Sequence, residues 1–140
     1  MSDLSPEAQF QSAMERYAQG ESAATLLPTF VGLCRQFPKN EVYLTCLSWL
    51  YLLEGKPDLA LNPAQQAVRL SPLSAQSRLN VVLAMLESGK KGVRPEVDRV
   101  QQIVLRDPDQ RDEVVTNLEE GSRRRPDWPA LIRVREWLSL

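Results

Sequence analysis

The chain has 140 residues, of which 43% are hydrophobic and 25% charged, and its formal net charge is −1. This length suits one domain with a sizeable core, and the near-zero charge gives no long-range field for nucleic acid or an anionic membrane, so we expect neither as a partner. The chain contains no histidine, the commonest general base and metal ligand. We therefore expect no catalytic residue, no metal and no cofactor.

The two cysteines, Cys34 and Cys46, lie in apolar stretches and match neither a zinc spacing nor a redox CxxC pair. We expect buried thiols in a reducing compartment. Residues 1–7 are polar and acidic and lack the apolar run of a signal peptide. The most apolar window, residues 42–53, is shorter than the roughly 20 residues that span a bilayer. We expect no membrane span and a cytoplasmic protein.

The first predicted unit covers about residues 7–40 and contains two helices. Its first helix carries Phe10, Ala13, Met14 and Tyr17 as an apolar stripe, its second carries Leu26, Phe30 and Leu33, and Pro38 ends the unit. Pro28 lies inside the second helix, where proline removes a backbone hydrogen bond.

The second predicted unit covers about residues 41–74. Its first helix is apolar all round, which indicates burial on every side, and Gly55 marks the turn that follows. Ala60, Ala64 and Ala67 lie on the second helix, which ends before Pro72. Their helical phase continues through Pro63, so we expect a kinked helix; the alternative is a shorter helix that starts at Pro63 with Asn62 as its cap.

The third predicted unit covers about residues 75–110, with Val81, Val82 and Met85 on its first helix. Pro95 opens its second helix, which carries the apolar stripe of Val97, Val100, Ile103 and Val104 and ends at Pro108. A short helix is then expected from Asp112 to Glu120, stopped by Gly121. A last helix, capped by Asp127, is expected to reach about Leu138.

The same landmarks recur at a nearly constant spacing through the three units. Pro38, Pro72 and Pro108 lie 34 and 36 residues apart; Gly20, Gly55 and Gly89 lie 35 and 34 apart; Tyr17, Tyr51 and Met85 lie 34 and 34 apart. Agreement of three independent markers on one period indicates an internal repeat.

The second unit resembles the tetratricopeptide repeat (TPR), which has a period of 34 residues. The matching positions are Leu44, Leu47, Ser48, Tyr51, Ala60, Ala67 and Pro72, whereas Ala64 stands where the family usually has an aromatic residue. The resemblance covers about residues 7–110 and implies an all-α fold: a right-handed superhelical stack of three TPR-like hairpins, with residues 111–139 as a two-helix C-terminal cap. The segment ALNPAQQAVRLSP is similar in style to small cyanobacterial TPR proteins.

The resemblance also implies a function, since the concave face of such a stack binds proteins. We expect a non-enzymatic scaffold or adaptor, either an assembly factor or a secretion chaperone, that holds a helical or apolar segment of a partner. The groove residues implied by the family's geometry are Gln11, Glu15, Val42, Thr45, Trp49, Leu53, Gln76, Leu79, Asn80 and Leu83. The alternative is a structural protein without a client, either a homodimer or larger homo-oligomer or a module that covers its own groove.

Two local questions stay open at this level. Trp49 is an anchor for a partner or is covered by the chain itself, with Trp128 or Trp137 packed against it. The run Arg123 to Arg125 is expected to interact with the carbonyl end of the helix stopped at Gly121 and with Glu119 and Glu120. The alternative is a contact with an anion or an acidic partner.

Overall fold

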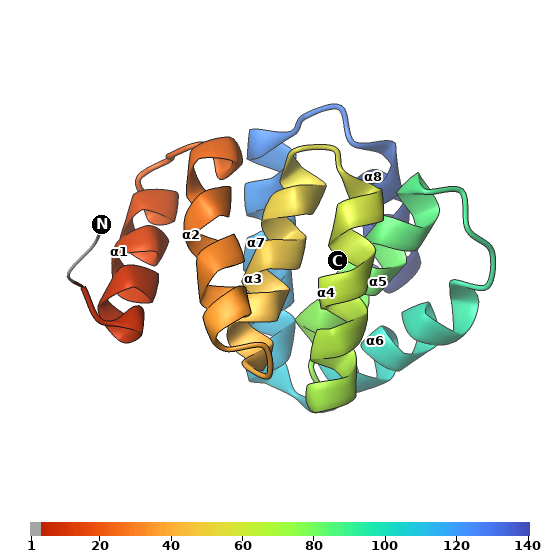
Figure 1. The fold of residues 1–140 in the computed structure, drawn as a ribbon. Helices are drawn as coiled ribbons and strands as arrows, with labels where there is room; N and C mark the ends of the chain where they lie inside the picture. The colour runs from red at the N-terminus through yellow and green to blue at the C-terminus, as the bar shows by residue number, and fades with distance from the viewer. Residues whose placement is uncertain (1–3) are drawn as a thin grey trace.

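The computed structural model describes residues 4–140, and the expectations for residues 1–3 lie outside this range (Figure 1). The described chain forms eight α-helices and no strand, which confirms the all-α prediction. They are α1 (Pro6–Ala18), α2 (Ala23–Gln36), α3 (Glu41–Leu53), α4 (Pro57–Leu70), α5 (Ala75–Glu87), α6 (Arg94–Arg106), α7 (Pro108–Arg124) and α8 (Pro129–Leu138). No helix in this range is long and apolar enough to cross a membrane.

Side-chain caps set the start of most helices. The N-cap side chains of α1, α2, α3, α5 and α7 each accept a hydrogen bond from a backbone N–H of the first turn; these caps are Ser5, Ser22, Asn40, Ser74 and Asp107. Proline occupies the first turn of α1, α4, α6, α7 and α8, where it removes no helical hydrogen bond.

The turns after α1, α3 and α5 have the same structure. Gly20, Gly55 and Gly89 all have positive φ values, of 93°, 67° and 71°. In each turn the residue after the glycine donates its backbone N–H to a carbonyl five residues earlier, as Lys56 does to Tyr51 at 2.9 Å. The regular spacing of these glycines therefore reflects a repeated helix–turn–helix geometry.

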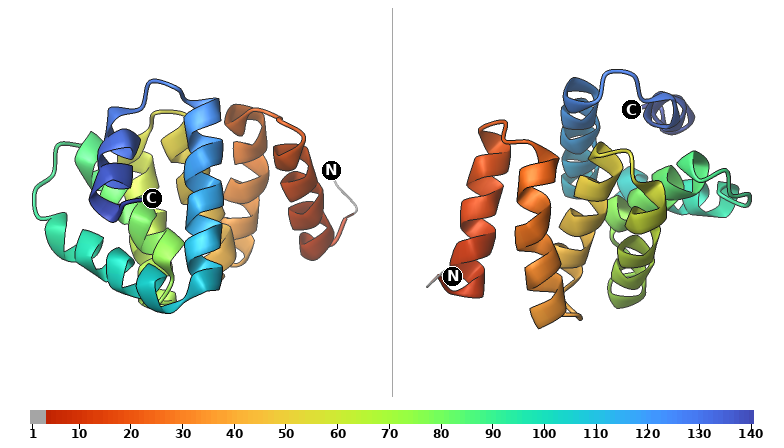
Figure 2. Two further views of the ribbon diagram at one scale, coloured as in Figure 1. Left: turned by 180° about the vertical axis from the view of Figure 1, so that it is seen from behind. Right: turned by 45° about the horizontal axis from the view of Figure 1, so that its top comes forward.

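The helices stack in chain order and then fold back. Each of α1 to α5 packs on the next helix along the chain, while α7 contacts α5 and α8 contacts both α5 and α6. Figure 2 shows α7 and α8 on the side of the stack that faces away from the viewer in Figure 1. The C-terminal helices thus cover a face of the stack as well as its end.

The C-terminal helices differ from the expected ones. α7 begins at Pro108, because Asp107 ends α6 and caps α7 at once, so the third unit stops before Gln110. Gly121 does not stop α7, which continues to Arg124. Asp127 does not cap α8, since Trp128 holds the N-cap position without a side-chain hydrogen bond.

The internal prolines do not end their helices. α2 runs through Pro28 and α4 runs through Pro63. The alternative of a shorter helix capped by Asn62 is therefore wrong; its side chain instead accepts a hydrogen bond from Gln66 one turn later. Packing of Pro63 and the alanines of α4 into the interior favours the continuous helix despite the lost bond.

The repeated turn predicts opposite effects for two glycine substitutions. Gly55→Ala places a side chain at a φ of 67°, which we expect to lower the free energy of unfolding by about 1 kcal/mol. Gly32→Ala, inside α2 with no atom within 4 Å of the added Cβ, is expected to raise it by about 0.5–1 kcal/mol. Urea denaturation of both variants checks the signs, and equal signs would contradict this view of the turn.

Candidate protein-binding cleft

Trp49 on α3 lies beneath α7 and the segment that follows it. Its side chain is 7% exposed, and its ring centroid lies 5.7 Å from that of Trp128. Gly121 allows the close approach, because a Cβ on this residue would lie 3.1 Å from the Trp49 ring. Trp49 is therefore covered by the chain itself, with Trp128 and not Trp137 against it.

The arginine run holds α7 against the C-terminal ends of other helices. Arg124 donates to the backbone carbonyls of Tyr17 (2.6 Å) and Glu21 (2.8 Å), and its guanidinium lies 4.0 Å from the Tyr17 ring centroid. Arg125 donates to the carbonyl of Leu52 at 2.8 Å and pairs with Glu87. Arg123 and Arg124 pair with Glu120 as expected. The carbonyls bound belong to the α1–α2 region and to α3, however, and not to the end of α7.

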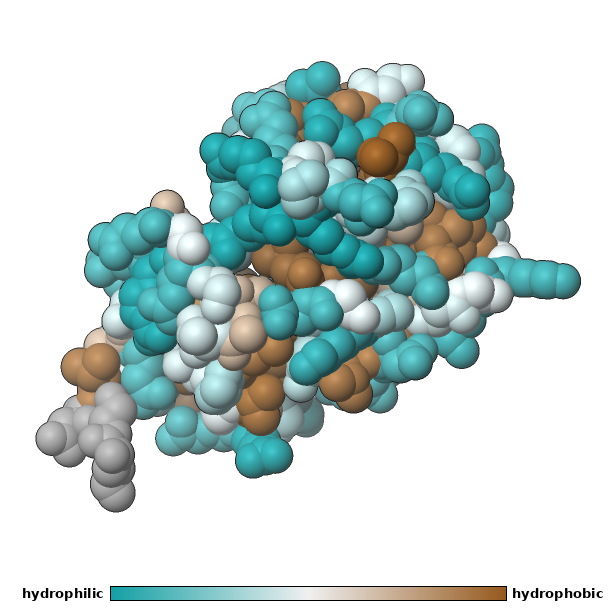
Figure 3. Space-filling view, turned by 90° about the horizontal axis from the view of Figure 1, so that it is seen from above, coloured by the Kyte–Doolittle hydropathy of each residue, from teal (hydrophilic) through white to brown (hydrophobic). Residues whose placement is uncertain are grey.

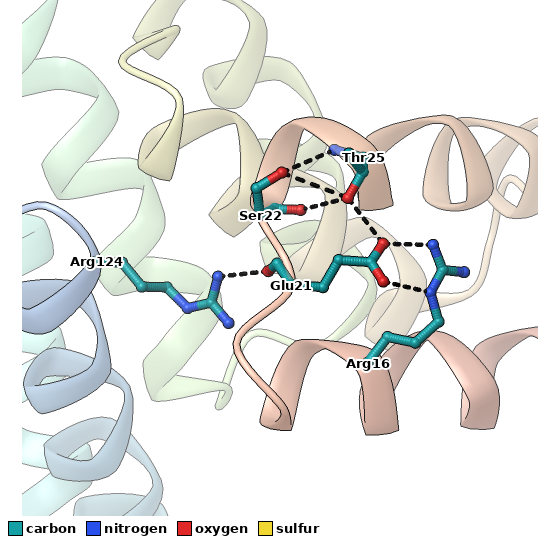
Figure 4. A network of polar contacts seen from close by, with 5 residues as sticks. All are labelled: Arg16, Glu21, Ser22, Thr25 and Arg124. Carbon is teal, nitrogen blue, oxygen red and sulfur yellow. Dashed lines mark hydrogen bonds and ion pairs between the residues drawn. The ribbon is translucent and has the colours of Figure 1, made fainter.

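The turn between α1 and α2, to which Arg124 is hydrogen-bonded, is itself stabilised by charged and hydroxyl groups. Figure 4 shows Glu21 between Arg16 and Thr25, with Arg124 reaching its carbonyl from α7. Hydrogen bonds from Arg16 first and Thr25 second lower the pKa of Glu21 to about 2. The Glu21 carboxylate is therefore charged at neutral pH, and its two partners fix the turn that presents the carbonyl.

A buried polar network joins α7 to the middle of the stack. Asn117 donates to Gln76 at 3.0 Å, Gln76 donates to Asn80 at 2.9 Å, and Asn80 donates to the Thr45 carbonyl at 3.2 Å. Such a fully paired network fixes the register of α7 along α3 and α5, since a shift would leave buried amides without partners.

An apolar cleft of about 300 Å³ remains open between α1 and α7, with α3 as its floor. Figure 3 shows hydrophobic surface in a hollow between polar lobes. The lining residues are Phe10, Met14, Tyr17, Phe30, Val42, Thr45, Cys46, Trp49, Leu50, Gln76, Glu113 and Asn117. Two of these lining residues are hydrogen-bonded to each other: the Tyr17 hydroxyl accepts a hydrogen bond from the Trp49 indole at 3.0 Å.

The ten residues expected in the groove fall into three groups. Val42, Thr45, Trp49 and Gln76 line the cleft. Leu53, Leu79, Asn80 and Leu83 are buried inside the chain; the last three lie on α5, which α7 and α8 cover. Gln11 and Glu15 are exposed on α1 and do not line the cleft. Their partner-binding role stays a prediction.

Sequence reasoning missed the α1 and α7 walls. It assigned Phe10, Met14 and Tyr17 to packing within the first unit, whereas these side chains line the cleft. Their spacing of four and three residues forms a stripe that a single neighbouring helix, α2, need not cover entirely, and this was the available signal. Glu113 and Asn117 carried no such signal, since their place depends on how α7 folds back.

Neither cysteine of the chain is an activated nucleophile, and only Cys46 lines the cleft. Burial raises the pKa of the Cys46 thiol to about 12 and that of Cys34 to about 11. Both thiols are therefore protonated and unreactive at neutral pH. Within residues 4–140 no group of three or more Cys, Asp or Glu side chains is placed to hold a metal ion. What the cleft presents is apolar contact surface beside carboxylate and amide groups.

No family model matches the chain, and no curated protein matches it significantly. Among solved structures, it is similar to the Yersinia enterocolitica type III secretion translocator chaperone SycD, in a crystal structure of an alternative dimer. The TM-score is 0.67 at 14% sequence identity, over 89% of this chain and 93% of that chain. At this identity the similarity concerns the fold: an all-helical chain whose helices superpose over almost the full length.

The buried position of Trp49 predicts a structural role for its side chain. We expect Trp49→Ala to lower the free energy of unfolding by about 3–5 kcal/mol, because it leaves a cavity between α3 and α7. Trp137→Ala, at a half-buried position on α8, is the control and is expected to cost less. Denaturant unfolding measures both, and a loss below about 1 kcal/mol for Trp49→Ala would contradict the packing of α7 on α3.

The close approach at Gly121 predicts a second substitution effect. Alanine improves helix propensity by about 1 kcal/mol in a helix interior. At Gly121 the added Cβ would lie 3.1 Å from Trp49 and 3.2 Å from Trp128, so we expect a net destabilisation of about 1–3 kcal/mol. Thermal unfolding of Gly121→Ala beside Gly32→Ala tests this, and a raised melting temperature for Gly121→Ala would show that α7 does not lie this close to α3.

Proposed function

We propose that this protein is a non-enzymatic scaffold that holds an apolar or helical segment of a partner protein in the cleft between α1 and α7. The observation that carries this proposal is the accessible apolar surface in the part of the groove that α7 and α8 do not cover. Met14 is 36% exposed and Val42 is 48% exposed at the cleft. Partners that bind such grooves insert apolar side chains from one face of a segment.

The chemistry of the cleft supports a binding role over a catalytic one. Its lining joins aromatic and aliphatic side chains to a few polar groups, as binding sites do. Its thiol is protonated, and the Trp49 indole N–H is satisfied by the Tyr17 hydroxyl oxygen. The proposal therefore needs no reaction step, and selectivity comes from the shape and charge of the walls.

The fold shared with SycD favours the chaperone variant of this proposal over the assembly-factor variant. SycD is a translocator chaperone in type III secretion, and we propose a comparable holding role here with a client of unknown identity. We also propose that the three helix pairs are TPR-like repeats and that the protein acts in the cytoplasm. The repeated glycine turns support the first of these two points.

A homodimer is the second candidate, since exposed apolar side chains also lie outside the cleft. Leu73 is 73% exposed and Leu105 is 79% exposed. A dimer through these residues would leave the cleft free, whereas a dimer through Met14 and Val42 would occupy it. Light scattering at several protein concentrations, repeated with the variants described next, distinguishes the two arrangements.

Matched glutamine variants test the proposed function. Met14→Gln with Val42→Gln makes the cleft polar without a change in charge, and Leu73→Gln with Leu105→Gln does the same to apolar surface elsewhere. Each double variant is expected to change stability by about 1 kcal/mol or less, as for exposed positions. A photo-crosslinking residue at position 42 then identifies proteins from the native lysate that contact the cleft directly.

We expect at least one protein to crosslink at position 42 and, once purified, to bind the wild type and the Leu73/Leu105 variant equally. Binding to the Met14/Val42 variant should be at least 10-fold weaker, which corresponds to about 1.4 kcal/mol. Equal affinity for the two double variants would show that the cleft is not the binding site.

A further inference from the structure

The two walls of the cleft differ in chemistry. The α1 side contributes the apolar side chains of Phe10 and Met14, whereas α7 contributes Glu113 and Asn117. A segment that fills the cleft therefore meets apolar surface on one side and a carboxylate and an amide on the other.

Glu113, which lines the cleft, lies near enough to two other carboxylates for their charges to act on it. Glu113 is exposed but partly desolvated at its carboxylate, and this partial desolvation first, and then the charges of Glu41 and Asp107, raise its pKa above the ordinary value. Glu41, at the start of α3, has only hydroxyl partners for its carboxylate: Ser77 at 3.3 Å and Thr45 at 3.4 Å. The Glu113 carboxylate thus lies among like charges, and no cation is among the groups that shift its pKa.

No cation of the described chain neutralises these two glutamates. None of the ion pairs within residues 4–140 includes Glu41 or Glu113. Arg124, on the same helix as Glu113, is committed to Glu120 and to the carbonyls of Tyr17 and Glu21 at the opposite end of the cleft.

The helix dipole accounts for only part of this arrangement. Glu41 lies in the first turn of α3, where a negative charge is favourable. Glu113 is the sixth residue of α7, beyond the first turn in which the dipole acts. Its charge beside an apolar cleft therefore has no stabilising partner within the described residues.

We propose that the segment that binds in the cleft is amphipathic and basic, with apolar side chains against Phe10 and Met14 and a lysine or arginine that pairs with Glu113 and Glu41. This inference rests on the proposed function and names the chemistry of its partner. A bound cation supplies the missing counter-charge, and the polarity of the cleft sets the direction of the segment, with its basic part away from Arg124.

A displayed library of random 16-residue peptides is the probe. The library is selected on the wild-type protein, and peptides that also bind the Met14→Gln/Val42→Gln variant are discarded, so that the remaining binders depend on the cleft. We expect these binders to combine apolar residues with an excess of Lys and Arg over Asp and Glu, relative to the unselected library.

The best peptide, labelled with a fluorophore, is then titrated against two charge variants by fluorescence anisotropy. Glu113→Gln removes the unpaired carboxylate and is expected to weaken binding about fivefold, the effect of one partly exposed ion pair. Glu119→Gln makes the same change on the same helix, at an exposed residue that belongs to none of the ion pairs in the described chain, and is expected to leave binding unchanged. Raising the salt concentration should weaken wild-type binding and reduce the difference between the variants.

Three results would overturn this inference. Cleft-dependent binders without an excess of Lys and Arg, or equal affinities for the Glu113 and Glu119 variants, would remove the charge part and leave cleft binding intact. A selection that returns no cleft-dependent peptide would count against both this inference and the proposed function.

Discussion

The contact between α7 and Trp49 is the constraint on which the functional surface depends. The Trp49 indole on α3 approaches α7 at Gly121, where a Cβ would lie only 3.1 Å from the ring. Trp128 then packs against the same indole from the segment before α8. Together these contacts bring the C-terminal helices onto a face that a simple stack of helix pairs would leave open.

The C-terminal end of α7 is held in place by hydrogen bonds from its arginines to backbone carbonyls near the ends of other helices. Carbonyls at the C-terminal ends of helices lack partners within their own helix, and cations are favourable beside them. Arg124 binds the carbonyl of Tyr17 at the end of α1 and that of Glu21 in the turn that follows, and Arg125 binds the carbonyl of Leu52 at the end of α3. The hydrogen bonds among Asn117, Gln76 and Asn80 fix the position of α7 along α5.

These contacts leave a cleft with two unlike ends. Arginine closes the end at which α1 and α3 terminate, whereas the carboxylates of Glu41 and Glu113 lie toward the end at which α3 and α7 begin. The part of the groove beside α5 has become core, and the part beside α1 stays open with Met14 and Val42 partly exposed. The accessible groove is therefore shorter, more aromatic and more acidic than its floor helices alone suggest.

The sequence by itself determined the helical repeat: the spacing of Gly20, Gly55 and Gly89 and the apolar stripes fix local turns and helix faces, because these depend on backbone conformation and nearby residues. It also indicated that Trp49 needs cover, since α3 is apolar all round. Only the tertiary structure decided what provides that cover, that Gly121 lies inside α7 instead of ending it, and that Phe10, Met14 and Glu113 face one cleft. Those features depend on contacts between residues about 70 to 110 positions apart, which no local periodicity encodes.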